Sequence, residues 1–288
     1  MATNSGQPNA AAAGTAVLGD LPVRRMGFGA MRITGRGVLG EPRDPEAAKA
    51  VLRRAVALGV TLIDTADSYG PAVSERLIAE ALHPYPAGLV IATKGGFLRS
   101  RGGGWRPDGR PAHLRQALEG SLKRLRVDRI DLYQLHTVDP NVPLEESLGA
   151  LVDAQAEGKI RHIGVSNVDA QQLAVSRRVA RVVSVQNRYS LSDRAFDPVV
   201  DACEREGLGF LPWRPLAAGA LAKPRAERAE EIARRHGVSY GQVALAWLLK
   251  RSPAMIPIPG TSSIAHLEEN VRAAEIGLTD EEFARLSP

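Results

Sequence analysis

The chain has 288 residues, of which 44% are hydrophobic, so it is long and apolar enough for one large α/β domain and too apolar for a disordered chain. Its single cysteine, Cys203, excludes an internal disulfide and any multi-cysteine metal site, and it is typical of a cytoplasmic protein. The net charge of +5 comes from interspersed charges of both signs, without a basic run that contains aromatics, so nucleic-acid binding is not expected. No apolar run is long enough to predict a membrane-spanning helix.

Residues 1–14 (MATNSGQPNAAAAG) are small and polar, without the basic start and apolar run of a signal peptide. We predict that they form a disordered leader, and that residues 15–288 form one domain.

In chain order, short apolar runs over 16–33 predict a β-hairpin that leads into a first strand at 26–30. A regular alternation of helices and strands follows, in which capping residues such as Asp44 and Thr279 mark helix starts and glycines mark helix ends. The Gly/Arg-rich segment 95–110 interrupts this pattern and predicts a long loop. The predicted strands are 26–30, 60–66, 89–94, 129–136, 160–166, 182–187, 208–213 and 254–258. The predicted helices are 46–58, 74–82, 113–127, 143–157, 169–179, 197–206, 226–236, 239–250, 263–274 and 279–286.

Such an alternation predicts an α/β protein with a parallel sheet and right-handed crossovers, which either closes into a (β/α)₈ TIM barrel or stays open as a doubly wound sheet. An open dinucleotide-binding sheet would carry a G-x-G-x-x-G fingerprint after its first strand, where this chain has GFGAM (27–31). The pattern therefore favours a (β/α)₈ barrel preceded by an N-terminal β-hairpin.

Polar residues stand where the predicted strands end, which is the catalytic face of such a barrel. Asp64, Lys94 and His136 end three consecutive strands, and Tyr69 follows Asp64 by five residues. Because a charge at the end of an apolar strand is costly unless it is paired, we expect these side chains to interact.

This set of residues indicates proton donation to a carbonyl oxygen. A tyrosine hydroxyl, with a usual pKa near ~10, is a poor acid at neutral pH, and we expect a buried lysine beside it to lower that pKa. Asp64 would keep Lys94 charged, and a neutral His136 would hydrogen-bond the carbonyl. No side chain here supplies electrons, so a nicotinamide cofactor is needed as the hydride donor.

The motifs resemble those of the aldo-keto reductase superfamily from about Arg25 to Asn270, and the resemblance implies the barrel fold and carbonyl reduction with NADPH. The matching strings, in order, are GFGAM (27–31), IDTADSYG (63–70), ATKGG (92–96), DLYQLH (131–136), GVSN (164–167), QNRYS (186–190), PWRPL (212–216) and PIPGTSSIAHLEEN (257–270).

Residue by residue, the resemblance places a catalytic tetrad on Asp64, Tyr69, Lys94 and His136, with Tyr69 as general acid in reduction and base in oxidation. It assigns the nicotinamide carboxamide to Ser166, Asn167 and Gln186, and ring stacking to Trp213, where the family more often has Tyr. The remaining cofactor contacts that it implies are Gly29, Ala30, Met31, Asp64, Arg214, Pro215, Leu216, Ala218, Gly260, Thr261, Ser262, His266, Glu269 and Asn270.

Two departures weaken the implied preference for NADPH over NADH. Gly260 and His266 stand where NADPH-specific members of the family carry Lys and Arg, while Thr261 and Ser262 remain to bind phosphate. We hypothesise that Arg214, next to Trp213, supplies positive charge to the cofactor from another direction.

Other interpretations remain open at this point. The chain could be a cofactor-binding redox sensor or regulatory subunit with little turnover, or Lys94 could form a Schiff base as in barrel aldolases. Taken alone, His136 could be a core histidine. Trp105 could line a substrate pocket or could only pack against its neighbours. We expect the pocket to be shaped by 95–110, by Met31 and Arg32, and by the segment after Trp213. No metal site is expected, and neither the individual carbonyl substrate nor the oligomeric state is encoded in a recognisable motif.

Overall fold

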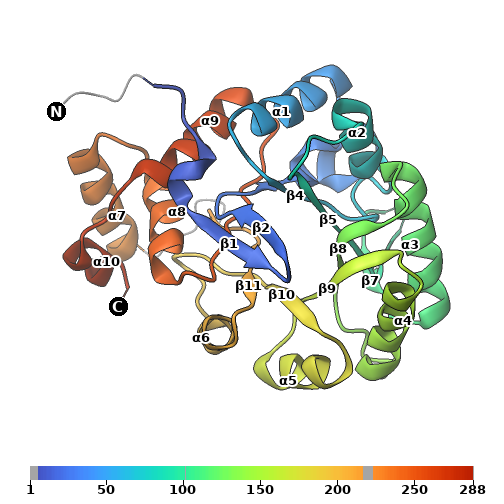
Figure 1. The fold of residues 1–288 in the computed structure, drawn as a ribbon. Helices are drawn as coiled ribbons and strands as arrows, with labels where there is room; N and C mark the ends of the chain where they lie inside the picture. Colours follow the sequence, from blue (N-terminus) through green and yellow to red (C-terminus); the bar gives the residue numbers. More distant parts are fainter. Residues whose placement is uncertain (1–5, 101, 217–222, 288) are drawn as a thin grey trace.

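A computed structural model describes residues 6–100, 102–216 and 223–287. Its main sheet is parallel and curls around a central axis, with the helices outside it (Figure 1). The order of the strands is β11-β10-β9-β8-β5-β4-β3. It follows the chain from one edge of the sheet to the other, without the reversal of strand order that defines a doubly wound sheet. The strands are β3 (Phe28–Gly29), β4 (Leu62–Asp64), β5 (Val90–Gly95), β8 (Ile130–Leu135), β9 (Ile160–Ser166), β10 (Val182–Gln186) and β11 (Gly209–Phe210).

The predicted eighth strand, 254–258, closes the barrel without being a regular strand. Ile256 N–H donates to the carbonyl of Phe210 at 2.8 Å on one side, and Gly27 N–H donates to the carbonyl of Pro257 at 2.9 Å on the other. Prolines have no N–H group, so this segment accepts hydrogen bonds from β3 but cannot complete a ladder. These bonds join the two edges of the sheet, and the (β/α)₈ barrel predicted from the alternation is confirmed.

The helices pack around the barrel as the sequence pattern predicts. The Asp44 side chain accepts from the N–H of Ala47 at the first helix, and Thr279 and Glu282 form a capping box at the last. The helices are α1 (Pro45–Ala57), α2 (Val73–Leu82), α3 (Pro111–Leu125), α4 (Leu144–Ala156), α5 (Ala170–Val179), α6 (Asp197–Glu206), α7 (Lys223–His236), α8 (Tyr240–Arg251), α9 (Ile264–Arg272) and α10 (Asp280–Leu286).

The predicted N-terminal hairpin, β1 (Thr15–Leu18) and β2 (Leu21–Arg24), lies across one end of the barrel in Figure 1. Leu18 and Val23 are buried in a cluster with Ile256 and other residues of the barrel interior. The hairpin therefore closes the amino-terminal end of the strands, which leaves the carboxyl-terminal end for ligands.

The prediction that residues 1–14 form a disordered leader is wrong for the part of this segment that the structure describes. Residues Ala10–Ala13 form the 3₁₀ helix η1, Ala10 is fully buried, and its N–H donates to the carbonyl of Leu58 at 2.9 Å. The sequence conceals this role, because an alanine that fills a gap in the packing cannot be told from an alanine in a loop without the structure. Residues 1–5 lie outside the described part of the chain.

The segment 95–110 is also more ordered than predicted. It contains an antiparallel hairpin of β6 (Phe97–Arg99) and β7 (Trp105–Pro107). Arg99 stacks over the ring of Trp105, 3.8 Å from its centroid, and donates to the carbonyl of Gly37 at 2.9 Å. Glycines and arginines without periodicity hid a hairpin whose order comes from these contacts.

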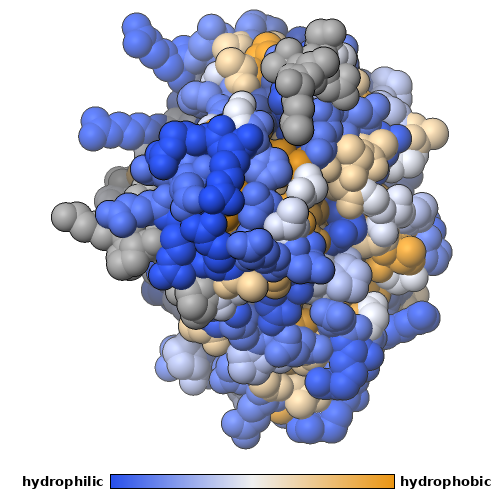
Figure 2. All heavy atoms as spheres, turned by 90° about the vertical axis from the view of Figure 1, so that its left-hand side faces the viewer, coloured by the Kyte–Doolittle hydropathy of each residue, from blue (hydrophilic) through white to orange (hydrophobic). Residues whose placement is uncertain are grey.

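The face shown in Figure 2 is mostly hydrophilic, with apolar residues in small groups among polar ones. None of the described helices combines the length and apolar character needed to cross a membrane.

Candidate active site

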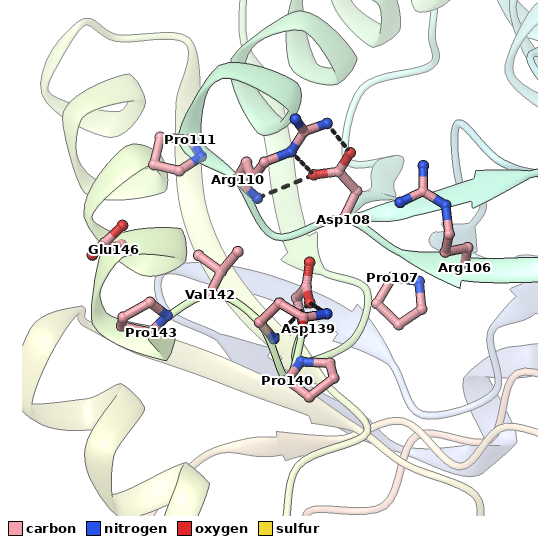
Figure 3. A pocket seen from close by; sticks show the side chains of 11 residues that line it. Arg106, Pro107, Asp108, Arg110, Pro111, Asp139, Pro140, Val142, Pro143 and Glu146 are labelled. Carbon is pink, nitrogen blue, oxygen red and sulfur yellow. Dashed lines mark hydrogen bonds and ion pairs between the residues drawn. The ribbon is translucent and has the colours of Figure 1, made fainter.

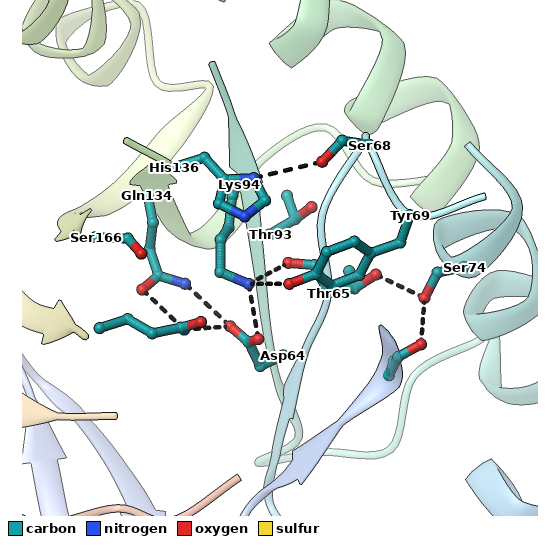
Figure 4. Close-up of polar contacts among 12 residues, drawn as sticks. Asp64, Thr65, Ser68, Tyr69, Ser74, Thr93, Lys94, Gln134, His136 and Ser166 are labelled. Carbon is teal, nitrogen blue, oxygen red and sulfur yellow. Dashed lines mark hydrogen bonds and ion pairs between the residues drawn. The ribbon is translucent and has the colours of Figure 1, made fainter. Parts of the chain in front are cut away.

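The structure brings Asp64, Tyr69, Lys94 and His136 together at the carboxyl-terminal end of the strands (Figure 4). Asp64 ends β4, Lys94 lies near the end of the adjacent β5, and His136 directly follows β8. Parallel strands end at one edge of a barrel, which is why residues so far apart in sequence become neighbours.

Lys94 is the centre of this cluster and is fully buried. Its Nζ donates to Asp64 Oδ2 at 2.7 Å, to the carbonyl of Thr65 at 2.8 Å and to Tyr69 Oη at 3.5 Å. A buried ammonium is tolerated only when charge and hydrogen bonds compensate the loss of water, and here all three donors have acceptors.

Asp64 is fixed by two glutamine side chains as well as by Lys94. Its Oδ1 accepts from Gln186 Nε2 at 2.8 Å and from Gln134 Nε2 at 3.1 Å. Gln134 was not singled out in the sequence, although it precedes His136 by two residues on a strand whose side chains alternate, so that both point the same way.

The pKa of Tyr69 differs from the sequence-based expectation. Burial is the largest influence and raises the pKa, while the charge of Lys94 lowers it by less. The prediction that Lys94 lowers the pKa of Tyr69 overall is therefore wrong for the protein without bound ligands. The hydroxyl of Tyr69 keeps its proton at neutral pH.

Lys94 itself is held in its charged form. Burial disfavours the ammonium, but the charge of Asp64 and the hydrogen bonds that Asp64 and Tyr69 accept outweigh that cost and raise the pKa of Lys94. A Schiff-base lysine requires a neutral amine and a lowered pKa. The geometry therefore disfavours the aldolase-type alternative.

His136 is held neutral. Burial, followed by the charge of Lys94, lowers its pKa well below the usual value. Its Nδ1 lies 3.4 Å from the hydroxyl of Ser68, a second residue that sequence reasoning missed because a serine in a loop carries no spacing signal. A neutral imidazole can donate one hydrogen bond, which suits contact with a carbonyl oxygen.

Aromatic rings line the space beside Tyr69 and His136. Phe97 lies 4.8 Å from His136, and Trp105 lies 6.1 Å from His136 and 6.3 Å from Tyr69, measured between ring centroids in edge-to-face pairs. Trp105, with 40% of its surface exposed, therefore faces the site as well as packing. Phe97 was not singled out from the sequence because it falls in the segment predicted to be a loop.

Three of the predicted cofactor residues form a connected group. Asn167 donates through Nδ2 to the carbonyl of His136 at 2.9 Å and to Ser166 Oγ at 3.1 Å, and its Oδ1 accepts from Trp213 Nε1 at 3.0 Å. The contact orients the indole of Trp213. Gln186, by contrast, uses its amide nitrogen on Asp64 and Gln134, so it supports the tetrad directly.

The predicted cofactor-contact residues at the end of the first strand lie against the segment that follows Pro257. A Cβ on Gly29 would lie 2.6 Å from the carbonyl oxygen of Ile258, and one on Gly260 would lie 2.5 Å from that of Gly29. Close backbone approach thus explains glycine at 260, where a lysine would be forced against β3. Ala30 and Met31 follow in the 3₁₀ helix η2 (Ala30–Ile33), which is held by a bond from Ser74 Oγ to the carbonyl of Ala30.

The remaining predicted cofactor residues lie at the start and inner side of α9 and after Trp213. Thr261 Oγ1 accepts from the N–H of Ser263, which caps α9, while Ser262 and His266 are exposed. Glu269 accepts from the hydroxyl of Ser239. Asn270 and Pro215 are buried, Leu216 is half-buried, Arg214 is exposed with a left-handed backbone, and Ala218 lies outside the described residues.

A separate hollow of about 680 Å³ opens where α3 and α4 begin (Figure 3). It is lined by Arg106, Asp108, Arg110 and Asp139, with several prolines. Asp108 binds Arg110, and Asp139 accepts from the N–H of Gly109, so the charged groups of the hollow serve mainly to hold the loop. None of the tetrad residues lines this hollow.

Comparison with known proteins agrees with this geometry. Residues 25–287 match the aldo/keto reductase family model. The chain is 49% identical to an uncharacterised oxidoreductase of Schizosaccharomyces pombe, over 96% of this chain and 90% of that protein. It is 42% identical to pyridoxine 4-dehydrogenase of Escherichia coli, over 94% of this chain and 96% of that protein.

Among solved structures, an aldo/keto reductase from Klebsiella pneumoniae in complex with NADP and acetate superimposes with a TM-score of 0.81 at 29% identity, over 94% of this chain and 93% of that one. The fold, the match over most of the chain and these relatives lead to one conclusion. The chain belongs to the aldo/keto reductase family, and it is an NAD(P)H-dependent oxidoreductase.

Proposed function

We propose that this protein reduces the aldehyde of a small aromatic molecule to an alcohol, reversibly, with Tyr69 as the proton donor. The observation that carries the proposal is the position of Lys94 Nζ, within hydrogen-bond reach of both Asp64 Oδ2 and Tyr69 Oη in a buried site. A tyrosine beside a fixed ammonium can release its proton because the tyrosinate that forms is stabilised at once.

The nicotinamide cofactor supplies the hydride. As negative charge develops on the carbonyl oxygen, Tyr69 donates its proton and Lys94 stabilises the resulting tyrosinate. Asp64, held by Gln134 and Gln186, keeps Lys94 charged and in place. His136, which is neutral, donates a hydrogen bond to the same oxygen and orients it.

The residues of the site fit the cofactor. The hydroxyl of Ser166 accepts from Asn167 and retains its own proton for an amide oxygen. Trp213, oriented by Asn167, offers a flat face for the nicotinamide ring. At the other end, the N-terminus of α9 offers partial positive charge for phosphate. We propose NADPH as the preferred cofactor, with Arg214, next to Trp213, supplying positive charge from another direction in place of a lysine at 260 and an arginine at 266.

The aromatic walls support the choice of substrate. Phe97, Trp105 and His136 present ring edges and faces around the reacting position, which favours a flat ring over a flexible chain. The relative with 42% identity is named pyridoxine 4-dehydrogenase. We therefore propose pyridoxal and similar ring aldehydes as substrates, in the cytoplasm, where the lone thiol of Cys203 would stay reduced.

The test is oxidation of NADPH and, separately, NADH, at 340 nm with pyridoxal, benzaldehyde and propionaldehyde, for wild type, Tyr69→Phe and Tyr85→Phe. Because a positioned general acid contributes about 10²–10⁴-fold, Tyr69→Phe should lose at least about 10²-fold in kcat while still binding cofactor. Tyr85, whose hydroxyl donates to the carbonyl of Leu125, is the matched control and should keep full activity.

Equal rates in wild type and Tyr69→Phe would contradict the role of Tyr69. Cofactor binding without oxidation by any of the three aldehydes would favour the regulatory alternative. A higher kcat/KM for propionaldehyde than for the ring aldehydes would contradict the proposed substrate class.

A further inference from the structure

The side chain of Arg32, in the 3₁₀ helix η2, lies beside Gly260. A Cβ placed on Gly260 would lie 3.6 Å from Cγ of Arg32, which is ordinary van der Waals contact. The same Cβ would lie 2.5 Å from the carbonyl oxygen of Gly29, so position 260 has no room for a side chain of its own. Among the described residues, the side chain nearest to this position is therefore a cation that comes from another segment.

The backbone that carries Arg32 is fixed by hydrogen bonds on both sides. Ser74 Oγ donates to the carbonyl of Ala30 at 3.1 Å, and Thr34 Oγ1 donates to the carbonyl of Met31 at 2.9 Å. Ala30 is fully buried, whereas Arg32 is exposed. The helix thus anchors itself in the barrel and presents the guanidinium of Arg32 to solvent.

No anion of the protein is paired with this guanidinium. Within residues 6–100, 102–216 and 223–287, Arg32 makes neither a hydrogen bond nor an ion pair. The two glutamates of α9 are engaged elsewhere: Glu268 pairs with Arg54 at 2.6 Å, and Glu269 accepts from the hydroxyl of Ser239. The planar donor set of Arg32 is therefore free for a carboxylate or phosphate of a ligand.

Two hydroxyl groups directly follow Gly260. Thr261 Oγ1 accepts from the N–H of Ser263 at 3.0 Å and keeps its own proton to donate. Ser262 is exposed, and its hydroxyl bonds to no group in the described part of the chain. Arg32, Thr261 and Ser262 thus combine one positive charge with two O–H donors, which suits the oxygens of a phosphate monoester.

Exposure separates this group from the residues proposed for the nicotinamide. Ser166 is 1% and Gln186 is 2% exposed, whereas Arg32 and Ser262 lie at the surface. An extended dinucleotide with its nicotinamide at the buried pair reaches the surface with its adenosine end. The 2′-phosphate that distinguishes NADPH from NADH belongs to that end.

We propose that Arg32 binds the 2′-phosphate of NADP(H), together with the hydroxyls of Thr261 and Ser262, and so determines the preference of this chain for NADP(H) over NAD(H). The inference deepens the proposed function and rests on its choice of NADPH. Arg32 acts through a charge-assisted hydrogen bond that NAD(H) cannot form, because its ribose carries a hydroxyl at the same place. Arg214 adjoins Trp213 and belongs to a different segment, so the two arginines are tested separately.

The test is calorimetric titration of NADP⁺ and, separately, NAD⁺ into the unliganded protein without aldehyde. Because a hydrogen bond to a charged group corresponds to about 10–100-fold in affinity, Arg32→Ala should raise the Kd for NADP⁺ by about that factor. The Kd for NAD⁺ should stay within about twofold, since NAD⁺ lacks the phosphate. Arg32→Lys, which keeps the charge and loses the planar donor set, should weaken NADP⁺ binding by less than Arg32→Ala does.

Arg178→Ala is the matched control. Arg178 is exposed and makes no ion pair within the described ranges, so its removal changes the net charge by the same amount. It lies at the end of α5, just before β10 begins at Val182, and so at the amino-terminal end of the barrel. Both nucleotides should bind to Arg178→Ala as they bind to wild type.

Three results would overturn the proposal. An unchanged Kd for NADP⁺ in Arg32→Ala would show that Arg32 is a solvated arginine or, if the KM for pyridoxal rises instead, that it faces the substrate. Equal losses for NADP⁺ and NAD⁺ would place Arg32 at the pyrophosphate, which both nucleotides share. Equal weakening of NADP⁺ binding in Arg32→Ala and Arg178→Ala would assign the effect to net charge.

The absence of aldehyde from the titration separates this inference from the proposed reaction. If Arg32→Ala selectively loses NADP⁺ but wild type reduces no aldehyde, the proposed reduction fails and the role of Arg32 stands. If wild type reduces pyridoxal with NADPH while Arg32→Ala binds NADP⁺ as wild type does, the reduction stands and the role of Arg32 fails.

Discussion

The side chains of the site owe their positions to the cost of burying charge. Lys94 is fully buried and Asp64 is 2% exposed, and such a pair is tolerated only because Gln134, Gln186 and the carbonyl of Thr65 complete the hydrogen bonds. The same cost keeps His136 neutral and Tyr69 protonated, which are the two states that the proposed reduction requires.

Removal of the charge of Asp64 should therefore destabilise the protein. Asp64→Asn leaves the ammonium of Lys94 without a counter-ion in a dry site, and we expect the free energy of unfolding to fall by about 3–5 kcal/mol in urea titrations. Asp153→Asn, which breaks an exposed pair with Arg115, should change it by less than about 1 kcal/mol. Equal losses in the two variants would show that Lys94 does not depend on Asp64.

Among the elements, the β6–β7 hairpin shapes the space beside Tyr69 and His136, where we propose that the substrate binds. Arg99 covers one face of Trp105 and binds the carbonyls of Gly37 and Gly103, so it ties the hairpin to the 3₁₀ helix η3 (Arg36–Val38). Trp105 is thereby held in edge-to-face contact with Tyr69 and His136.

Arg99→Ala should loosen this hairpin without unfolding the barrel. We expect faster hydrogen exchange at 97–99 and 105–107, and a KM for pyridoxal raised several-fold with kcat within about twofold, because the change affects the fit of the ring and leaves the tetrad in place. Arg106→Ala, on the same hairpin but exposed, is the control and should alter neither quantity. A loss of kcat at constant KM in Arg99→Ala would contradict this role.

For the whole molecule, the two ends of the barrel differ, because only the amino-terminal end is covered by the segment that precedes the barrel. The β1–β2 hairpin and η1 pack on the amino-terminal end, where residues as far apart as Ala10 and Leu58 are joined. The polar strand ends are left at the opposite face, where the proposed catalytic groups and the β6–β7 hairpin meet.

The buried segment before β1 should contribute to the stability of the whole barrel. Ala10→Glu puts a charge at a position that is fully buried, and we expect Tm to fall by roughly 4–10 °C in a thermal melt followed by circular dichroism. Ala11→Glu, on the exposed side of the same 3₁₀ helix, should leave Tm nearly unchanged. A similar Tm for both variants would mean that residues 9–13 do not pack on the barrel in solution.

The sequence by itself determined the alternation of strands and helices, the barrel and the list of polar residues at strand ends, because hydrophobic periodicity and capping residues are local signals. Only the tertiary structure decided that prolines interrupt the eighth strand, that alanines of the supposed leader are buried, and that Gly260 lies against Gly29. It also decided the direction of each pKa and revealed Gln134, Phe97 and Ser68, since burial and contacts between distant segments leave no periodic trace in a single sequence.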